Sequence, residues 1–246
     1  DEWASFCEAI CQKFDIPLTI KKVSLVEKNR ISLEQQSRDA RYQIIAETLS
    51  PCSVLLTAHH VGDQAETFLY RLIRGSGSKG LSCMAVVADY PNSLGKSKSL
   101  NIARPLLKVE KRKLIELVES NELTFVQDDS NKDNRFDRNF LRNDVLTVLK
   151  QRWPNIDNSI AKSADLLRQE SDVLNEYLAE DLQEFTGCGF LDIECLNITK
   201  LRSIGGSKRN LLLRLFLQEK TGIYPGVTLL EQVNVQIFES KEDQQP

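Results

Sequence analysis

The residues best suited to chemistry lie between His59 and Thr67, where two adjacent histidines precede two carboxylates. Asp63 and Glu66 are spaced i, i+3, so in the first turns of a helix their side chains would project from one face. Such a pair could hold a substrate ammonium group or Mg²⁺, or accept a proton. The same spacing is typical of acidic residues that only complement a helix dipole, and the histidines could be packed and hydrogen-bonded. The residues alone therefore indicate a polar cluster whose role stays open.

The elements that must position this cluster alternate between helix and strand. The short apolar run Ser53–Ala58 is typical of a strand buried on both faces of a parallel sheet, and it leads directly into His59. A helix from Asp63 to Arg74, closed by Gly75, follows. Upstream, periodicity and capping signals predict a helix over 3–14, a strand over 17–25 and a helix from Ser32 to about Leu49, ended by Pro51. This order predicts an α/β domain with a Rossmann-like, doubly wound parallel sheet, in which ligands sit at the carboxyl ends of the strands.

The second half of the chain is mainly helical. We expect a polar turn or hairpin tip over 89–101, a helix around 114–118 and another from Arg135 that stops near Pro154. Beyond these the sequence predicts a long helix over 156–185, a short strand at Phe190–Ile193 and helices over 210–220 and 229–238. We therefore predict an α/β domain over residues 1–154 and a mostly α-helical domain over residues 155–246.

Composition limits the function classes. The net charge of −3, with 41% hydrophobic and 27% charged residues, is that of a soluble globular protein, and no apolar run is long enough for a membrane span. Without a leader sequence, the cytoplasm is the expected location. The six cysteines contain no C-x-x-C pair, so buried structural thiols are expected rather than a zinc site. A basic helical stretch at Arg135, Arg138, Arg142, Lys150 and Arg152 is either a solvated face or a local contact for RNA phosphates.

Four collinear segments carry a family resemblance. The segment from His59 to Leu81 resembles the H-H-x-D-D-Q-x-E-T…R-G-S-G…G-L motif of the tRNA(Ile)-lysidine synthetase family. Ser32–Tyr42 resembles the acidic and double-arginine helix of that family, and Arg104–Leu107 resembles its R-P-L segment. Asp128–Arg142 resembles its D-x-S-N…R-N-x-x-R motif. Agreement in all four, in the same order, favours membership of this family.

The resemblance implies a fold and a reaction. The fold is an N-type ATP pyrophosphatase domain followed by a helical domain that binds substrate. The reaction joins L-lysine to C2 of the wobble cytidine of tRNA(Ile), so that the anticodon reads AUA. ATP first adenylates the base oxygen with Mg²⁺ at the phosphates, and the lysine ε-amine then displaces AMP. The partners implied are tRNA(Ile) and L-lysine, with no membrane, and a homodimer is left open.

The resemblance also implies roles for individual residues. Asp63 and Glu66 match the acidic pair associated with lysine recognition, and together with Arg38 they are the expected catalytic residues. The residues expected to bind substrate are Arg41, His59, His60, Arg71, Arg74, Asp128, Ser130 and Asn131. Arg138 and Arg142 are expected to bind tRNA, and no residue is assigned to a metal. Asp128, Ser130 and Asn131 could equally form an Asx or Ser turn, a structural role compatible with a place in the site.

The sequence departs from the family pattern in two places. The ATP-binding loop S-G-G-x-D-S is absent, because the first glycine in the chain is Gly62. The stretch Ser203–Ser207 only imitates that loop, and we expect a turn before the helix at Asn210. Gly62 also stands where the family has the first of two consecutive aspartates. We therefore expect the pyrophosphatase domain to lack its first strand and loop, and these 246 residues alone to be inactive in ATP–pyrophosphate exchange.

Two other functions compete with this interpretation. Enzymes of the 2-thiocytidine synthetase class share the core, but they carry paired C-x-x-C cysteines that this chain does not have. A non-catalytic tRNA-binding module on the same scaffold would differ in the coding sequence upstream of Asp1. A strand followed by S-G-G-x-D-S there would favour the enzyme, and an initiator Met next to Asp1 would favour the module.

Overall fold

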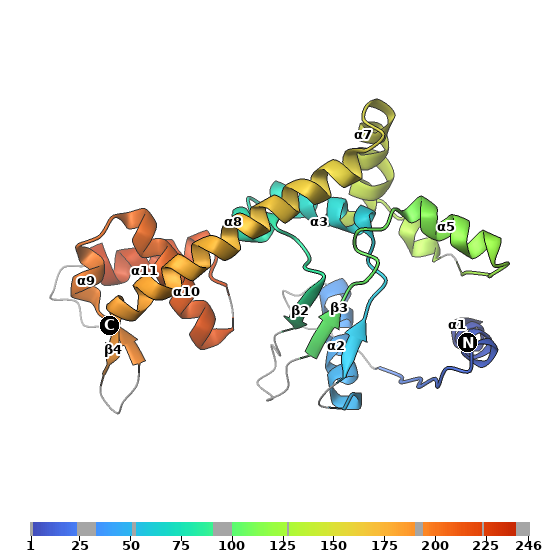
Figure 1. Cartoon of the computed structure of the whole chain (residues 1–246), viewed down its shortest axis with the longest axis horizontal. Helices are drawn as coiled ribbons and strands as arrows, with labels where there is room; N and C mark the ends of the chain where they lie inside the picture. The colour runs from blue at the N-terminus through green and yellow to red at the C-terminus, as the bar shows by residue number, and fades with distance from the viewer. Residues whose placement is uncertain are drawn as a thin grey trace. The chain divides into compact units, whose positions relative to one another are not determined.

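A computed structural model describes residues 2–23, 33–50, 53–90, 100–126, 128–189, 194–222 and 224–239 of the chain (Figure 1). The chain divides into two compact units, Asp1–Asp165 and Leu166–Pro246, here called unit 1 and unit 2. Unit 1 contains a three-stranded sheet with helices, whereas the described part of unit 2 is helical apart from one hairpin. These residues thus form an α/β unit and a mostly helical unit, as the sequence predicts.

The division between the units lies inside α8 (Ile156–Phe185), not after residue 154 where the sequence led us to expect it. The early turns of α8 are tied to unit 1 by side chains. Asp157 pairs with Lys150 at 2.7 Å, and the Asn158 amide donates a hydrogen bond to Glu110 at 2.9 Å. Pro154 marks the end of one helix, but it does not decide against which unit the next helix packs.

The sheet of unit 1 consists of β1 (Val54–Leu56), β2 (Val87–Tyr90) and β3 (Leu100–Ala103) in the order β1-β3-β2. β1 runs parallel to β3, with Leu55 opposite Ile102, whereas β2 runs antiparallel to β3. The described sheet is therefore mixed rather than wholly parallel as predicted, because β2 and β3 are consecutive antiparallel strands. Their pairing fits the hairpin tip expected over 89–101, of which residues 91–99 lie outside the described part.

β1 is less buried than the sequence predicts. Val54 and Leu56 are 51% and 67% exposed, although an apolar run of this kind is typical of a strand covered on both faces. A strand is buried in that way only when helices cover both faces and strands flank both edges. In the described sheet β1 pairs on one edge only, with β3, and the buried centre is Ile102 of β3.

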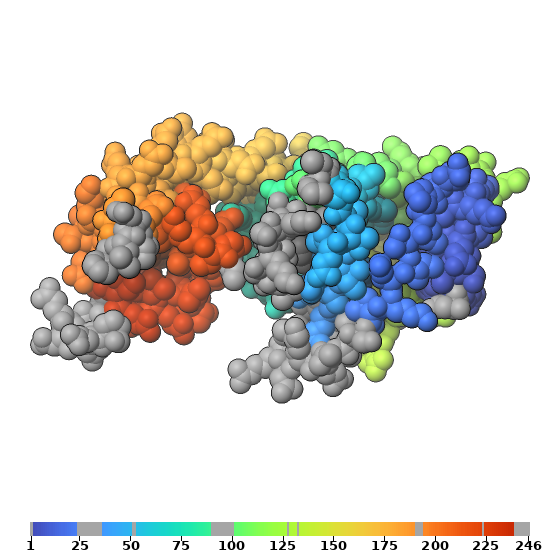
Figure 2. Space-filling view, turned by 90° about the horizontal axis from the view of Figure 1, so that it is seen from below, coloured from blue at the N-terminus to red at the C-terminus, as the bar shows by residue number. Residues whose placement is uncertain are grey.

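The helical segments described in unit 1 are α1 (Glu2–Lys13), α2 (Leu33–Thr48), α3 (Val61–Ile73), α4 (Ser78–Leu81), α5 (Lys111–Ser120), a 3-10 turn η1 (Asp129–Lys132), α6 (Asp137–Phe140), a π-turn η2 (Leu141–Val145) and α7 (Leu146–Arg152). α1 and α2 lie on the face of unit 1 shown in Figure 2. α3 is central: Val61 and Ala65 are buried, and the helix contacts α4, α6 and η2. Gly75, at φ 70°, ends it in the left-handed region that favours glycine.

Two predicted elements of unit 1 have a different form. The expected strand over 17–25 is not formed at residues 17–23, and residues 24 and 25 lie outside the described part. Alternating apolar residues are not sufficient for a strand, because its backbone groups need a neighbouring strand, and the described sheet offers none here. The helix expected from Arg135 is built of α6, η2 and α7 in succession, with the π-turn in the middle.

Unit 2 is built from the later turns of α8 followed by β4 (Thr186–Cys188), β5 (Glu194–Leu196), α9 (Ile198–Arg202), α10 (Gly206–Thr221), α11 (Val227–Asn234) and a π-turn η4 (Val235–Glu239). Its core is formed by leucines from α8 to α11 and by Phe185, with Leu201 and Leu212 fully buried. The strand expected at Phe190–Ile193 lies outside the described residues, and the observed hairpin pairs Gly187 with Cys195. Residues 203–205 form a turn as expected, but α10 begins at Gly206, so Gly206 and Ser207 belong to the helix rather than to the turn.

The thiols differ from expectation in their burial. Cys7, Cys188 and Cys195 are free and exposed, whereas buried structural thiols were predicted; Cys52 lies outside the described residues. Helical periodicity placed Cys7 on an apolar face, but no residue of α1 is buried. Within the described ranges, no helix is both long enough and apolar enough to cross a membrane.

Candidate active site

The cluster predicted from the sequence lies where β1 leads into α3. Beyond β1, the Thr57 amide donates to the Ala103 carbonyl at 3.0 Å, which continues the parallel pairing up to the first histidine. His60 then caps α3: its Nδ1 accepts a hydrogen bond from the Gly62 amide at 3.0 Å, and its own amide donates to Asp63 Oδ2 at 2.8 Å. This reciprocal pair is a capping box in which histidine takes the usual place of serine or threonine. Asp63 therefore has the structural role that its position in a first helical turn left open.

Gly62 is explained by the same cap. A Cβ atom at position 62 would lie 2.8 Å from Cε1 and 3.1 Å from Nδ1 of the His60 ring. Real Cβ atoms do not approach other atoms so closely, so the imidazole could not keep this position beside a larger residue. The absence of a side chain at Gly62 thus leaves room for the His60 ring in its capping position.

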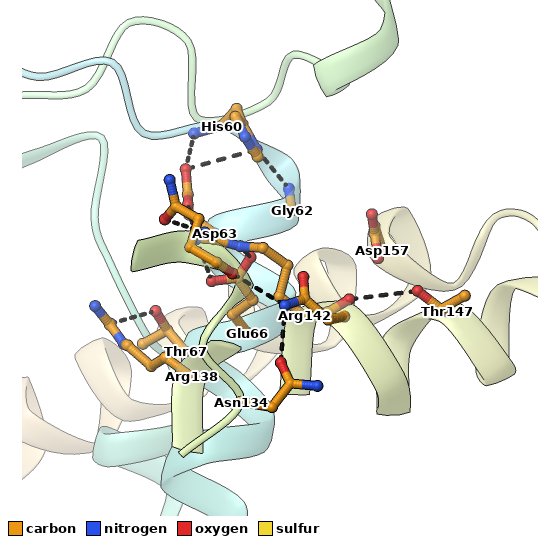
Figure 3. A network of polar contacts seen from close by, with 12 residues as sticks. His60, Gly62, Asp63, Glu66, Thr67, Asn134, Arg138, Arg142, Thr147 and Asp157 are labelled. Carbon is orange, nitrogen blue, oxygen red and sulfur yellow. Dashed lines mark hydrogen bonds and ion pairs between the residues drawn. The ribbon is translucent and has the colours of Figure 1, made fainter. Parts of the chain in front are cut away.

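Arg142 and Glu66 form the central contact of the site (Figure 3). Arg142 Nε donates to Glu66 Oε1 at 2.6 Å and Nη2 donates to Oε2 at 2.9 Å, a bidentate pair. Glu66 is only 4% exposed. The hydrogen bond to Glu66 raises the pKa of Arg142, so the guanidinium keeps its charge although it is partly buried. The π-turn η2 brings Arg142 to α3 from the last of the four sequence motifs.

Asp63 lies next to this ion pair but makes no hydrogen bond to Arg142. Its Oδ1 lies 3.8 Å from Arg142 Nη2, beyond hydrogen-bond distance, while Oδ2 receives the His60 amide. Two carboxylates and one guanidinium give the trio of Asp63, Glu66 and Arg142 a formal net charge of −1. Glu66 is buried and accepts two hydrogen bonds from Arg142. Asp63, whose side chain is partly exposed, is therefore the carboxylate of the trio that a ligand can reach.

A set of asparagine amides fixes the loop that carries Asp128, Ser130 and Asn131. The Asn139 amide donates to the carbonyls of Ser130 at 2.8 Å and Asp133 at 2.9 Å, and the Asn143 amide donates to the Asn131 carbonyl at 3.0 Å. Asn131 in turn accepts a hydrogen bond from Arg142 Nη1 at 3.3 Å. The loop is therefore held against α6 and η2, and Asn131 lies beside the trio.

Asp128 and Ser130 form the turn that the sequence allowed. The Ser130 amide donates to Asp128 Oδ1 at 2.9 Å, so Asp128 caps the 3-10 turn η1. These hydrogen bonds from Ser130 lower the pKa of Asp128, which keeps its carboxylate charged. The structural role is thus observed, and it places both residues near the cluster.

The remaining arginines of the predicted site serve α3 in different ways. Arg138 Nη2 lies 3.4 Å from Thr67 Oγ1, and its guanidinium lies 6.0 Å from the centre of the Tyr70 ring. Arg74 lies over the same ring at 5.1 Å and donates to its hydroxyl, and Arg71 donates to the Gly80 carbonyl at 2.7 Å. Arg138 and Arg142, both expected to bind tRNA, therefore each have a partner on α3; their binding of tRNA stays a prediction.

His59 precedes the helix cap and lies beside Thr57. Its Nδ1 lies 2.8 Å from Thr57 Oγ1. Burial lowers the pKa of His59, and the charges of Arg104, Arg38 and Arg138 lower it further, against the opposing effect of Asp63. Arg38 is thus within electrostatic reach of the cluster, and it also lies over the Tyr42 ring at 5.7 Å. Arg41 is exposed on α2.

The sequence did not indicate which side chains would meet. The pairing of Arg142 with Glu66 joins two motifs 76 positions apart, and only the family resemblance hinted that they share a site. The spacing of Asn139 and Asn143, one helical turn apart, could have indicated an amide-bearing face. No group of three or more histidine, cysteine, aspartate or glutamate side chains that could hold a metal ion is found in the described part of the chain.

Comparison with known proteins assigns the chain to a family. The sequence pattern of the PP-loop domain family matches residues 1–149, and the chain belongs to that family. A protein named tRNA(Ile)-lysidine synthase from Haemophilus ducreyi is 38% identical over 246 residues, which is 100% of this chain and 55% of that protein. Proteins with the same name from Actinobacillus pleuropneumoniae and Salmonella schwarzengrund are 37% and 35% identical, again over 100% of this chain and over 56% and 54% of their own lengths. The chain thus spans about half the length of these relatives.

A solved structure supports the fold independently. The U34-tRNA thiolase NcsA from Methanococcus maripaludis, determined with its 4Fe-4S cluster, matches with a TM-score of 0.52 at 19% sequence identity. The match covers 67% of this chain and 57% of the thiolase. At this identity the likeness concerns the fold, and it agrees with the α/β architecture of unit 1.

Proposed function

We propose that the protein ligates L-lysine to C2 of the wobble cytidine of tRNA(Ile), using ATP and releasing AMP and pyrophosphate. The proposal is supported by the similarity of the whole chain to proteins named tRNA(Ile)-lysidine synthase and by its membership of the PP-loop domain family. The structural observation behind it is the trio of Asp63, Glu66 and Arg142, which has a formal net charge of −1 and in which Asp63 is the accessible carboxylate. A site of this kind suits a single cation, such as the ε-ammonium of lysine.

The reaction has two steps. The O2 atom of the cytidine attacks the α-phosphorus of ATP, the bond to the β-phosphate oxygen breaks, and pyrophosphate leaves. The lysine ε-amine then attacks C2, and the C2–O2 bond breaks with loss of AMP. The neutral fraction of the lysine ammonium attacks, its first proton having gone to water, and the nitrogen becomes acidic once it bonds to the ring, so that a carboxylate can take the second proton. Asp63 is the group in the trio that can do so, because both Glu66 oxygens receive hydrogen bonds from Arg142.

The negative charge of Glu66 adds to the attraction that Asp63 exerts on a bound cation. Arg142 reduces this attraction because its guanidinium pairs with Glu66. Arg38 and Arg41 are suited to the lysine carboxylate or to a phosphate, because guanidinium groups bind both in bidentate fashion. His59, His60, Arg71, Arg74, Asp128, Ser130 and Asn131 complete the proposed substrate site. Arg138 and Arg142 remain proposed for tRNA.

ATP and Mg²⁺ are co-substrate and metal in this proposal. The described residues offer no cluster of three acidic or histidine ligands. Mg²⁺ commonly binds through nucleotide phosphates and few protein carboxylates, so no described residue is assigned to it. tRNA(Ile) and L-lysine are the proposed partners, the cytoplasm the proposed location and a homodimer the proposed assembly, to be checked by light scattering of the purified protein.

Mass analysis of tRNA(Ile) tests the proposal. The full-length protein, incubated with ATP, lysine and tRNA(Ile), should add the mass of lysine less one water to the nucleoside at the wobble position. Asp63→Asn should keep the His60 cap, because the amide oxygen can accept the same hydrogen bond, yet raise the KM for lysine. Asp172→Asn, an exposed change in unit 2, is the matched control. A protein that folds, binds ATP and leaves tRNA(Ile) unchanged in mass would overturn the proposal.

A further inference from the structure

An open cleft of about 750 Å³ adjoins the charged trio within unit 1. The polar part of its lining includes His60, Asn131, Arg142 and Asn143, all of which belong to the site already described. The apolar part of its lining includes Leu114 and Val118 of α5 together with Phe125. The cleft is therefore amphipathic, and it is joined to the proposed lysine position through His60 and Arg142.

A ligand for this cleft needs an apolar face and a polar edge. Nucleobases have both, and their faces stack on aromatic side chains while their edges bind amides, guanidinium groups and carboxylates. Phe125 is 58% exposed, so its ring is largely available at the apolar part of the lining. Asp128, which also lines the cleft, keeps a charged carboxylate that could accept a hydrogen bond from an exocyclic amino group such as that of cytosine.

The rim of the cleft carries positive charge. α5 begins with Lys111, Arg112 and Lys113, all exposed, and Lys111 lines the cleft itself. Cations are unfavourable in a first helical turn because the helix dipole is positive there. Glu116 offsets the charge of Arg112 by pairing with it at 3.0 Å. A polyanion at this rim would satisfy these charges, as the phosphates beside a base in RNA would.

We propose that this cleft receives the extruded base of the RNA substrate, with Phe125 stacking on its face and Lys111 and Lys113 contacting the phosphates beside it. The inference rests on the proposed function and adds to it the place of the base. A base bound there lies beside His60 and Arg142, and so beside the amine position at Asp63. The open form of the cleft and the cations along its rim favour a base that is part of a polymer over the adenine of ATP.

Steady-state kinetics of the full-length enzyme tests the stacking contact. Phe125→Ala should lower kcat/KM for tRNA(Ile) by about 5- to 150-fold, the usual effect of removing one stacked aromatic ring, and leave KM for ATP and for lysine unchanged. Phe125→Trp should retain most of the activity. Phe136→Ala is the matched control, since Phe136 is 48% exposed and does not line the cleft. An unchanged kcat/KM for tRNA in Phe125→Ala would overturn the inference, and so would a raised KM for ATP, which would assign the cleft to adenine.

Two further measurements keep the test independent of activity. tRNA(Ile) with 4-thiouridine at the wobble position should cross-link under ultraviolet light to the peptide that contains Phe125, and cross-links confined to other peptides would contradict the inference. Lys111→Gln with Lys113→Gln should reduce the salt dependence of tRNA binding by about one unit of slope per lost contact, whereas Lys22→Gln should not. If the wild-type enzyme modifies tRNA(Ile) and Phe125→Ala does so with the same kcat/KM, only the inference about the cleft is wrong. If the wild-type enzyme does not modify tRNA(Ile), the proposed function is wrong.

Discussion

Arg142 grips Glu66 through two hydrogen bonds, Nε to Oε1 at 2.6 Å and Nη2 to Oε2 at 2.9 Å, across a sequence separation of 76 positions. The pair joins η2 to the middle of α3, and through Asn131 it extends to the loop after α5. A buried carboxylate is costly unless it is paired and hydrogen-bonded. The contact therefore does two things at once: it makes Glu66 tolerable inside unit 1, and it fixes where the fourth sequence motif lies.

Removing Arg142 should destabilise the protein. Arg142→Met leaves Glu66 buried without its partner, and we expect a loss of about 2–3 kcal/mol, below the roughly 3–5 kcal/mol of fully buried pairs because Arg142 is partly exposed to solvent. Adding Glu66→Gln should recover a large part of this loss, since the uncompensated charge is then gone. Urea unfolding of the single and double variants measures both effects.

An exposed pair provides the control for this cycle. Arg112 and Glu116 are one helical turn apart on α5 and lie 3.0 Å from each other, with both side chains largely in solvent. Arg112→Met should cost less than about 0.5 kcal/mol. If Arg142→Met and Arg112→Met had equal effects, the pairing with Glu66 would not be the stabilising contact described here.

Much of this fold could be predicted from the sequence, because local signals sufficed for it. The apolar run before His59 marked β1, and the carboxylates after it marked the start of α3, since strand and helix periodicities differ. The antiparallel pairing of β2 with β3 was implicit in the hairpin tip expected over 89–101, whereas the alternating order of helices and strands pointed to a wholly parallel sheet. The strand expected at residues 17–23 is not formed, because alternation measures amphipathicity, not the presence of a neighbouring strand.

The candidate site was predictable in position but not in its contacts. Asp63 could be placed at a strand end, yet its bond to the His60 amide depends on a histidine acting as a helix cap, which is unusual among cap residues. The tRNA contact expected of Arg142 stays a prediction, but the bond of its guanidinium to Glu66, made from the π-turn η2, could not be predicted from the local pattern. Side-chain direction of this kind depends on tertiary packing, which a local pattern does not contain.

The cap at α3 predicts that the effect of Gly62→Ala on the free energy of unfolding changes sign with the residue at position 60. Gly62→Ala should destabilise the protein, because the added Cβ would lie 2.8 Å from His60 Cε1 and force the imidazole away from the Gly62 amide. In a His60→Ala background the same substitution should stabilise by about 0.5–1 kcal/mol, since alanine is favoured over glycine within a helix and the clash is gone. Urea midpoints of the four proteins decide the matter. The same sign in both backgrounds would contradict the role given to Gly62.

His59 predicts a pH dependence of stability. Its pKa is lowered, first by burial and then by neighbouring arginines, from the ordinary value of 6.5, so the unfolded chain binds a proton before the folded protein does. As pH decreases below about 6.5, protonation therefore favours unfolding, and stability is lost until the folded-state pKa is reached. His59→Gln removes this titration. The difference in unfolding free energy between wild type and variant should shift between about pH 7.5 and 5.5, and parallel curves over that range would exclude His59 as the source.

The asparagine bonds predict a local rather than a global effect. Asn139 donates to two carbonyls of the loop, those of Ser130 at 2.8 Å and Asp133 at 2.9 Å, so Asn139→Ala should release residues 128–134 from α6. Each lost bond contributes about 1 kcal/mol, and amide hydrogen exchange in the loop should accelerate accordingly, by about tenfold or more. Asn121→Ala, whose amide serves only its own helix end, is the control. Asn131 also accepts a hydrogen bond from Arg142 Nη1 at 3.3 Å, so release of the loop should disturb the trio and raise the KM for lysine. Faster exchange in the loop with an unchanged KM for lysine would show that the loop does not support the site.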